Sequence, residues 1–213
     1  MVIGAERWNS NRGRAYLLLG SSSLATSISL SDSVPNFSGT TADEYASHSV
    51  SRAGDLNGDG LADFLVGAYL FDNPNPVYVN AGAAFIFYGA RGTPASTLSS
   101  SAMLTTNANL GQYFGYPVAA AGDVNGDGYG DFMVGRYHAT VSGDVNRGTA
   151  YLFFGASATL SGTFYVEGMT NVVIFQGVSA GDMAGSWCNG AGDINGDGYD
   201  DVLVGEYAYN GFI

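Results

Sequence analysis

One oxygen-rich pattern occurs three times in this chain of 213 residues and restricts what the chain can fold into more than any other feature. Asp-x-Asn-x-Asp-Gly-x-x-Asp begins at Asp55, Asp123 and Asp193. Asp, Asn and Gly are also common turn residues, but three copies with identical spacing make ordinary turns a poor explanation. Oxygen atoms at alternate positions of a tight loop suit a hard cation with many oxygen ligands. We therefore expect three calcium-binding loops.

The residues after each loop exclude the best-known loop of this kind, the EF-hand. An EF-hand needs a bidentate Glu at position 12 and a helix on each side, whereas Val66, Val134 and Val204 stand at position 12 here. They lie in short apolar runs closed by Gly, which are typical of buried strands. Each loop is thus expected to join two strands and to use a ninth-position Asp as its closing ligand. The expected ligands are Asp55, Asn57, Asp59, Leu61 and Asp63; Asp123, Asn125, Asp127, Tyr129 and Asp131; and Asp193, Asn195, Asp197, Tyr199 and Asp201, with the residue at position 7 contributing its backbone carbonyl.

Composition supports an all-β chain and excludes some partners. The sequence has 32 Gly and 14 Tyr, 46% hydrophobic residues and only 12% charged residues, which favours many short strands and tight turns. Nineteen acidic residues face seven Arg and no Lys, giving a net charge of -12. Nucleic acid is a poor partner for such a surface, because its binding depends on clustered Lys and Arg. No apolar run approaches the length of a membrane span, so membrane insertion is not expected.

A longer repeat surrounds each loop. The first loop residues are 68 and 70 residues apart, and the aromatic motifs GAAFIFYG (Gly82–Gly89) and GTAYLFFG (Gly148–Gly155) follow the first two loops. A third copy, GRAYLLLG (Gly13–Gly20), has no loop before it. Ser/Thr-rich segments such as Ser21–Leu30 leave room for a weak outer strand. Four strands per unit of nearly 70 residues predict β-propeller blades, each a four-stranded antiparallel sheet.

These motifs resemble a known family. AGDxNGDGxxDxxVG, the segment YFGYPVAAAGD (Tyr113–Asp123) and the later GTAYLFFG are similar to the FG-GAP repeat of integrin α-subunit β-propellers and of related bacterial surface proteins. The Phe-Gly element is plain only at Phe114-Gly115, and Ala46-Ser47 and Ala184-Gly185 occupy the comparable places. The resemblance covers essentially the whole chain. It implies a propeller with calcium in the loop that joins the first two strands of a blade.

The phase of the repeat divides the chain into a single array. We expect the end of one blade in residues 1–45, whole blades in 46–112 and 113–180, and the first half of a further blade in 181–213. About three blades are too few to close a ring, since propellers use about four to eight. The array is therefore expected to be open, to be completed by another chain, or to be part of a longer protein.

Three other features have plain structural interpretations. Cys188 is expected to be a small buried apolar residue, and His48 and His138 are expected to be surface or packing histidines, because neither has a second ligand at metal-binding spacing. Asn36-Phe37-Ser38 matches an N-glycosylation acceptor pattern, and the sequence leaves its use open.

The function expected from these observations is a calcium-stabilised structural or adhesion scaffold outside the cell. Self-association through complementary part-blades would give a ring or a filament, and an extracellular protein or glycan is a further candidate partner. No known catalytic motif is present, so an enzyme is not expected. The alternative is a carbohydrate-binding module, or the accessory propeller of a larger secreted enzyme, for which an exposed Trp8 or Tyr78 would be the supporting feature.

Overall fold

A computed structural model describes residues 1–32, 34–74, 77–92, 94–107 and 111–207. Within these residues the regular secondary structure is almost entirely β-strand, as expected. Two short helical turns interrupt it, α1 (Trp8–Asn11) and the 3₁₀ turn η1 (Val166–Gly168). The all-β prediction is confirmed.

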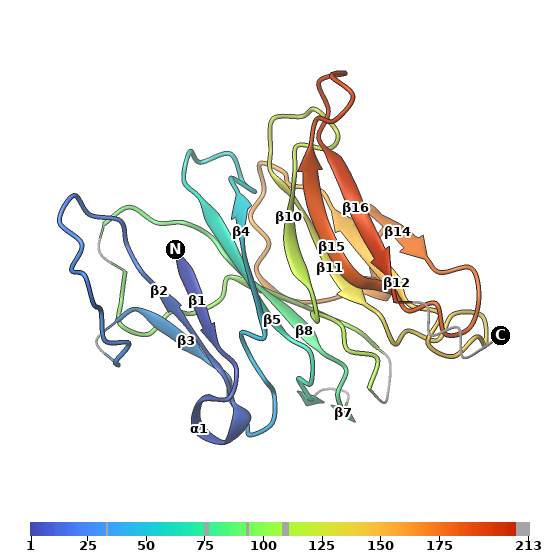
Figure 1. Ribbon diagram of the computed structural model, residues 1–213, viewed down its shortest axis with the longest axis horizontal. Helices are drawn as coiled ribbons and strands as arrows, with labels where there is room; N and C mark the ends of the chain where they lie inside the picture. The colour runs from blue at the N-terminus through green and yellow to red at the C-terminus, as the bar shows by residue number, and fades with distance from the viewer. Residues whose placement is uncertain (33, 75–76, 93, 108–110, 208–213) are drawn as a thin grey trace.

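Four sheets follow one another along the chain and stand side by side, each packed against the next (Figure 1). The first contains β1 (Val2–Ala5), β2 (Arg14–Leu17) and β3 (Asn36–Ser38). The second is built on β4 (Ser49–Gly54), β5 (Asp63–Ala68), β8 (Ala83–Phe87) and β9 (Ala102–Thr105), and the third on β10 (Val118–Gly122), β11 (Asp131–Arg136), β12 (Thr149–Phe153) and β14 (Val172–Gln176). The fourth contains β15 (Ala184–Gly192) and β16 (Asp201–Glu206), and a separate small hairpin joins β6 (Asn73–Pro74) to β7 (Val77–Tyr78). This arrangement of sheets is that of propeller blades, and it is not closed into a ring.

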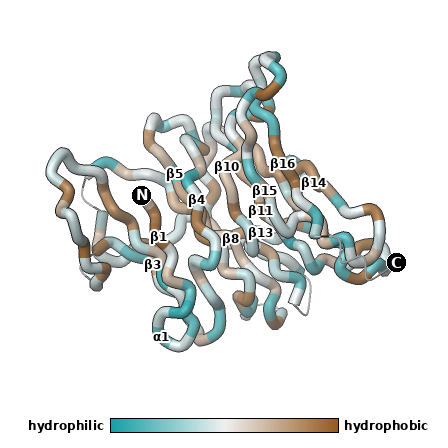
Figure 2. Tube along the Cα trace, viewed as in Figure 1, coloured by the Kyte–Doolittle hydropathy of each residue, from teal (hydrophilic) through white to brown (hydrophobic). Residues whose placement is uncertain are grey.

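The second strand of each complete sheet is the core of the fold. Every residue of β5 and of β11 is buried, and each strand pairs antiparallel with the aromatic third strand, β8 or β12. Strands buried on both faces read as continuous apolar runs, which explains DFLVG and DFMVG. Figure 2 shows hydrophobic residues along strands throughout the array, and the apolar clusters fill the spaces between neighbouring sheets.

The long connections reach back to the preceding blade. β13 (Gly162–Tyr165) leaves the third sheet and pairs parallel with β9 of the second, which makes that sheet five-stranded. A parallel bridge from Asn36 to Thr97 repeats the arrangement one blade earlier. Purely four-stranded antiparallel blades were therefore too simple an expectation. The added strand covers an edge that would otherwise expose unpaired backbone groups.

The outer strand of the first sheet was also placed wrongly. Ser21–Leu30 contains no strand, and its apolar side chains Leu24 and Ile28 are exposed. The outer strand is β3 instead, where the Phe37 ring packs 4.9 Å from that of Phe85 and 5.1 Å from that of Phe87. Burial against the neighbouring blade, rather than local alternation, selects the strand.

The Phe-Gly element makes a backbone contact between blades. The first glycine of each aromatic motif has a left-handed φ near +78°, and a Cβ there would overlap the backbone of the next blade. These glycines are Gly13, Gly82 and Gly148, and they abut Ala46, Phe114 and Ala184 respectively. Ala46 and Ala184 are as buried as Phe114. Because the contact is made by backbone atoms, it is kept in the two repeats that have Ala46 or Ala184 where the third has Phe114.

Candidate metal centre

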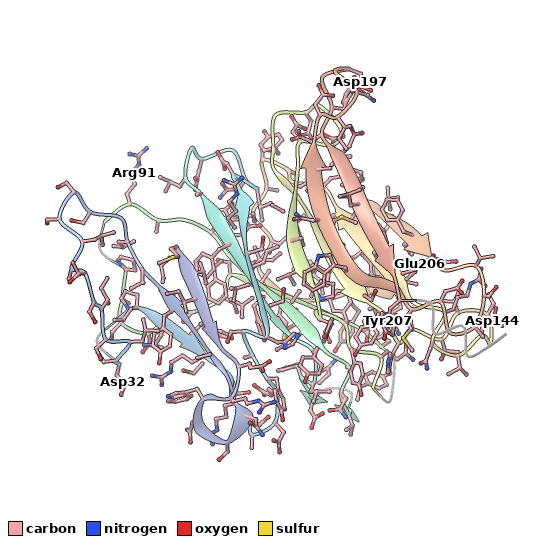
Figure 3. All side chains as sticks on the ribbon, in the orientation of Figure 1. Asp32, Arg91, Asp144, Asp197, Glu206 and Tyr207 are labelled. Atoms are coloured by element: carbon pink, nitrogen blue, oxygen red, sulfur yellow. The ribbon has the colours of Figure 1, made fainter. Side chains whose placement is uncertain are left out.

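The three oxygen-rich loops lie at the same end of the molecule. They join β4 to β5, β10 to β11 and β15 to β16 (Figure 1). Asp197 marks the tip of the third loop, and Glu206 lies at the far end of β16 (Figure 3). Before each loop the ladder slips by one residue at a glycine with positive φ, namely Gly54, Gly122 or Gly192. Such a bulge bends the strand and releases the loop from the ladder at its first Asp.

The first loop is wound around the carboxylate of Asp55. Its Oδ1 accepts hydrogen bonds from the backbone N–H groups of Gly58 (2.7 Å) and Asp59 (3.1 Å), and its Oδ2 accepts one from Gly60 (2.7 Å). Asn57 donates from Nδ2 to Asp59 Oδ2 over 3.2 Å. The side chains at positions 1, 3 and 5 are therefore held within one tight turn.

The other two loops repeat this hydrogen bonding. Asp123 accepts from the N–H groups of Asp127 (3.0 Å) and Gly128 (2.9 Å). Asp193 accepts from Gly196, Asp197 and Gly198 over 2.7 to 3.1 Å. The N–H of Gly198 is the main reason that the pKa of Asp193 is lowered. The same sequence pattern thus gives the same local fold in three different blades.

The ninth-position carboxylates lie beneath the loops. Asp63 is 1% exposed and Asp131 is 0% exposed. Asp63 accepts hydrogen bonds from Leu56 N–H at the start of the loop and from Gly89 N–H after the third strand, both over 2.7 Å. Asp131 uses Val124 and Gly155 in the same way, both over 2.8 Å. One carboxylate therefore ties the start of a loop to the end of the third strand of the same blade.

Burial makes these two carboxylates electrostatically unusual. Desolvation raises the pKa of Asp63 and of Asp131, the two N–H donors oppose this effect, and the acidic residues at positions 5 and 1 add to it. No ion pair within the described residues includes either carboxylate. Buried charges are normally paired or bound to a metal. A cation in the loop would supply the missing counter-charge.

Asp201 differs from its two counterparts. It is partly exposed, and within the described residues its carboxylate accepts one hydrogen bond, from Ile194 N–H over 2.9 Å. The second donor in the other blades, Gly89 or Gly155, follows the aromatic third strand. In the part of the chain that the structure describes, no such strand pairs with β16.

The residues fit a hard divalent cation by their chemistry. Among the described residues, no three acidic, His or Cys side chains gather into a ready-made metal cluster, because the loop carboxylates turn toward their own backbone amides. Oδ1 of Asp55 and of Asp193 accepts two hydrogen bonds, but Oδ2 of each accepts one. A carboxylate oxygen with one hydrogen bond keeps a free lone pair, so coordination through Oδ2 is not blocked. The donors at positions 1, 3, 5, 7 and 9 are all oxygen atoms, which suits calcium better than soft metals. The fifteen ligands stay a prediction.

Both histidines belong to a band of aromatic rings at the other end of the β-strands. His48 contacts Glu6 and the rings of Tyr69 and Tyr116. His138 lies 4.7 Å from Tyr113, and burial lowers its pKa. The aromatic band comprises Tyr45, His48, Tyr69, Tyr113, Tyr116, Tyr137 and His138. The sequence did not lead us to expect this band. A Tyr nevertheless stands two residues after the glycine of β5, β11 and β16, at Tyr69, Tyr137 and Tyr207, and this repetition could have indicated it.

Three side chains singled out in the sequence have structural roles. Trp8 is covered by the guanidinium of Arg14, whose Cζ lies 3.4 Å from the ring centroid, so it is no open platform for a sugar. Asn36 is 6% exposed and donates from Nδ2 to the carbonyls of Val34 and Ser96. This amide is occupied and covered, unlike a glycan acceptor. Cys188 is buried, which raises the pKa of its thiol to about 12.

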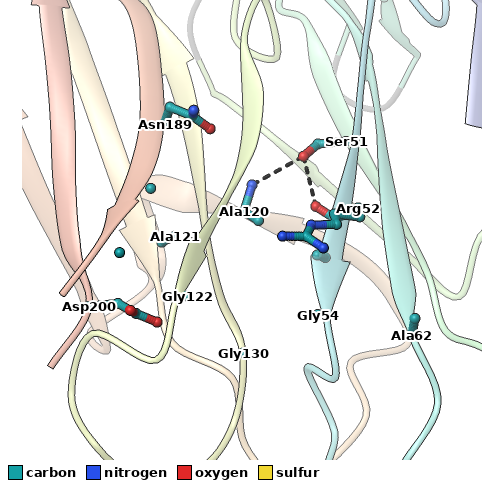
Figure 4. Close-up of a pocket in the computed structure, with 13 residues that line it drawn as sticks. Ser51, Arg52, Gly54, Ala62, Ala120, Ala121, Gly122, Gly130, Asn189 and Asp200 are labelled. Carbon is teal, nitrogen blue, oxygen red and sulfur yellow. Dashed lines mark hydrogen bonds between the residues drawn. The ribbon is translucent and has the colours of Figure 1, made fainter. Parts of the chain in front are cut away.

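A cavity of about 680 Å³ lies between the inner strands of the second, third and fourth sheets. Figure 4 shows that backbone and small side chains form most of its walls, with Arg52, Asn189 and Asp200 as polar exceptions. Ser51 Oγ joins two sheets there by accepting a hydrogen bond from Ala120 N–H over 3.1 Å. The cavity is thus lined mainly by the inner strands β4, β10 and β15 and by the loops that follow them.

None of the helices in the described residues has the length and apolar character needed to cross a membrane.

Comparisons with known proteins agree with the geometry. A family model described as FG-GAP repeat matches residues 49–87, 114–153 and 189–213, each of which contains one of the three loops. Integrin alpha-IIb of Homo sapiens is 30% identical over 211 residues, which is 98% of this chain and 18% of that protein. Integrin alpha-5 of Xenopus laevis is 31% identical over 97% of this chain and 18% of its own length, and integrin alpha-PS2 of Drosophila melanogaster is 31% identical over 81% and 12%. The chain thus spans less than a fifth of these relatives. With three matched repeats in consecutive sheets, it belongs to the FG-GAP repeat family.

Proposed function

We propose that this chain is a non-catalytic adhesion scaffold that works outside the cell or at its surface and is stabilised by about three calcium ions. The support from the comparisons is its similarity to integrin alpha chains over almost its whole length. The support from the structure is a set of three loops with the same local fold in successive sheets.

The observation that carries the calcium proposal is the pair of buried carboxylates, Asp63 and Asp131. Each joins the start of its loop to the end of the third strand. A cation above the carboxylate would neutralise it and hold the loop against the blade. Such binding to the folded state stabilises the fold by mass action. Extracellular modules with weak sites work at millimolar calcium, which matches loops as exposed as these.

Thermal unfolding in calcium and in chelator tests this proposal. Asp127→Asn changes an exposed loop carboxylate without removing a core contact. We expect it to lower the melting temperature in millimolar calcium and to have little effect in chelator. Glu206→Gln is the control, because it removes the same charge from the end of β16 that lies away from the third loop, and it should behave alike in both buffers. Equal losses for Asp127→Asn in both buffers, with no calcium uptake by calorimetry, would contradict the proposal.

The scaffold is further proposed to self-associate through β16. Among the described residues this strand pairs only with β15. Leu203 on β16 is 59% exposed, whereas its counterparts Leu65 and Met133 are fully buried. The aromatic third strand of a second copy, β2, carries the repeat signature that fits this edge. Because β1 and β3 occupy both edges of β2, this pairing requires β16 to displace β1. Gly20 N–H would then take the role for Asp201 that Gly89 and Gly155 have for Asp63 and Asp131. A closed arrangement gives a ring, and an open one gives a filament.

A further inference from the structure

Successive loops are joined to one another by the same two contacts. The backbone N–H of Gly130, at position 8 of the second loop, donates to the carbonyl of Asp55, at position 1 of the first, over 2.8 Å. Asp200 N–H donates to the carbonyl of Asp123 over 3.0 Å, which is the same bond between the third and second loops. Each later loop is therefore anchored on the first ligand residue of the loop before it.

An aromatic ring makes the second contact. A Cβ placed on Gly58, at position 4 of the first loop, would lie 2.5 Å from Cε1 of Tyr129. A Cβ on Gly126 would lie 2.6 Å from Cε1 of Tyr199. The position-7 tyrosine thus lies directly over the position-4 glycine of the preceding loop. Both glycines have positive φ, +74° and +73°, so their lack of a side chain serves both the turn and the ring.

The contact between the second and third loops has an additional bond. The Asp200 carboxylate accepts a hydrogen bond from Asp123 N–H over 2.8 Å. The equivalent residue one loop earlier is Gly130, which has no side chain to do this. The second and third loops are therefore joined more firmly than the first and second.

We infer that the position-7 tyrosines, Tyr129 and Tyr199, are positioning residues for the neighbouring metal loop, so that calcium binding at successive loops is positively coupled. The inference rests on the proposed calcium sites. Positions 7 and 9 are the predicted ligands on either side of the bonded position 8. A cation that orders positions 7 and 9 of one loop also fixes two groups of the preceding loop, the carbonyl of position 1 and the glycine of position 4. The preceding loop then loses less conformational entropy when it binds its own cation. By linkage the effect is reciprocal.

Hydrogen exchange followed by mass spectrometry during a calcium titration tests the coupling, because peptides report each loop separately. Asp197→Asn weakens the third loop. We expect the calcium midpoint of the second loop to rise about five-fold or more, the lower end of typical coupling between sites, and that of the first loop to rise less.

Two tyrosine variants localise the effect, and both use the Leu that stands at position 7 of the first loop. Tyr199→Leu should reduce the dependence of the second loop on the third. Tyr129→Leu should leave that dependence unchanged and reduce the dependence of the first loop on the second. If the calcium midpoint of each loop is unaffected by substitutions in the neighbouring loops, the coupling is refuted while the calcium sites remain. Loops that gain no protection from calcium would overturn both.

Discussion

At the scale of single residues, the chemistry of Cys188 follows from burial alone. Its thiol is enclosed between the third and fourth sheets, beside Ala121 and Met133, and burial raises its pKa to about 12. The thiolate is the reactive form of cysteine. A lone cysteine with this environment acts as a core side chain.

We expect Cys188 to be unreactive in the native protein. Ellman's reagent at neutral pH should label it at the rate of unfolding, and fast labelling should appear only in denaturant. Rapid labelling of the native protein would show that the fourth sheet opens readily.

A pH effect belongs to His138. Burial places its folded-state pKa below the ordinary 6.5, so the unfolded chain binds more protons in the window just below that value. The contribution of His138 to stability is therefore fully present above about pH 6.5 and is lost as the pH falls through the lowered pKa. His138→Phe keeps a ring beside Tyr113 and Tyr137 but cannot titrate.

We expect the free energy of unfolding of His138→Phe to fall less between about pH 7 and pH 5 than that of the unaltered protein. Urea titrations at several pH values measure this difference. Above about pH 8 the offset between the two proteins should be constant. Parallel pH profiles throughout would contradict the assignment.

At the scale of elements, one glycine per blade decides how neighbouring sheets meet. Gly82 has φ +79°, and a Cβ there would overlap the carbonyl oxygen of Phe114 in the next blade. Gly143 has a similar φ of +94° but has open space around it. Substitution of Gly143 by Ala would lower stability through backbone conformation alone, whereas substitution of Gly82 would add crowding between two blades.

We expect Gly143→Ala to cost about 1–2 kcal/mol, the usual price of a left-handed non-glycine residue. Gly82→Ala should cost clearly more, because it also forces two sheets apart. Chemical denaturation of both variants measures the difference. Equal losses of unfolding free energy in the two variants would mean that neighbouring blades can move apart at little cost.

At the scale of the whole molecule, the last sheet exposes large apolar side chains. Trp187 is 71% exposed, Ile194 is 69% exposed and Leu203 is 59% exposed. The corresponding position is fully buried at Leu65 and Met133. A surface that is core in two blades and exposed in a third is the physical basis for the proposed self-association.

Leu203→Lys is expected to weaken self-association without unfolding the chain, since a charge is tolerated on this exposed face but not in an interface core. Sedimentation velocity in millimolar calcium measures the change. Val145→Lys, on a loop residue that is 60% exposed, is the matched control. A monomer at all concentrations for the unaltered protein would refute self-association.

The sequence by itself determined the repeat and the local fold of each loop. The spacing of Asp, Asn and Gly dictates hydrogen bonds within a few residues, so Asp55, Asp123 and Asp193 are enclosed in the same way in three blades. Burial of DFLVG and DFMVG was readable too, because a strand covered on both faces must be apolar throughout.

Only the tertiary structure decided which segments pack across blades. β13 joins the preceding sheet and β3 replaces the expected strand at Ser21–Leu30, because burial against a neighbouring blade outweighs weak local patterns. The contacts of His48 with Tyr116 in the aromatic band and of Tyr129 with Gly58 also join residues about 70 positions apart. Local spacing cannot specify such contacts, since they depend on the angle and distance at which one blade is set against the next.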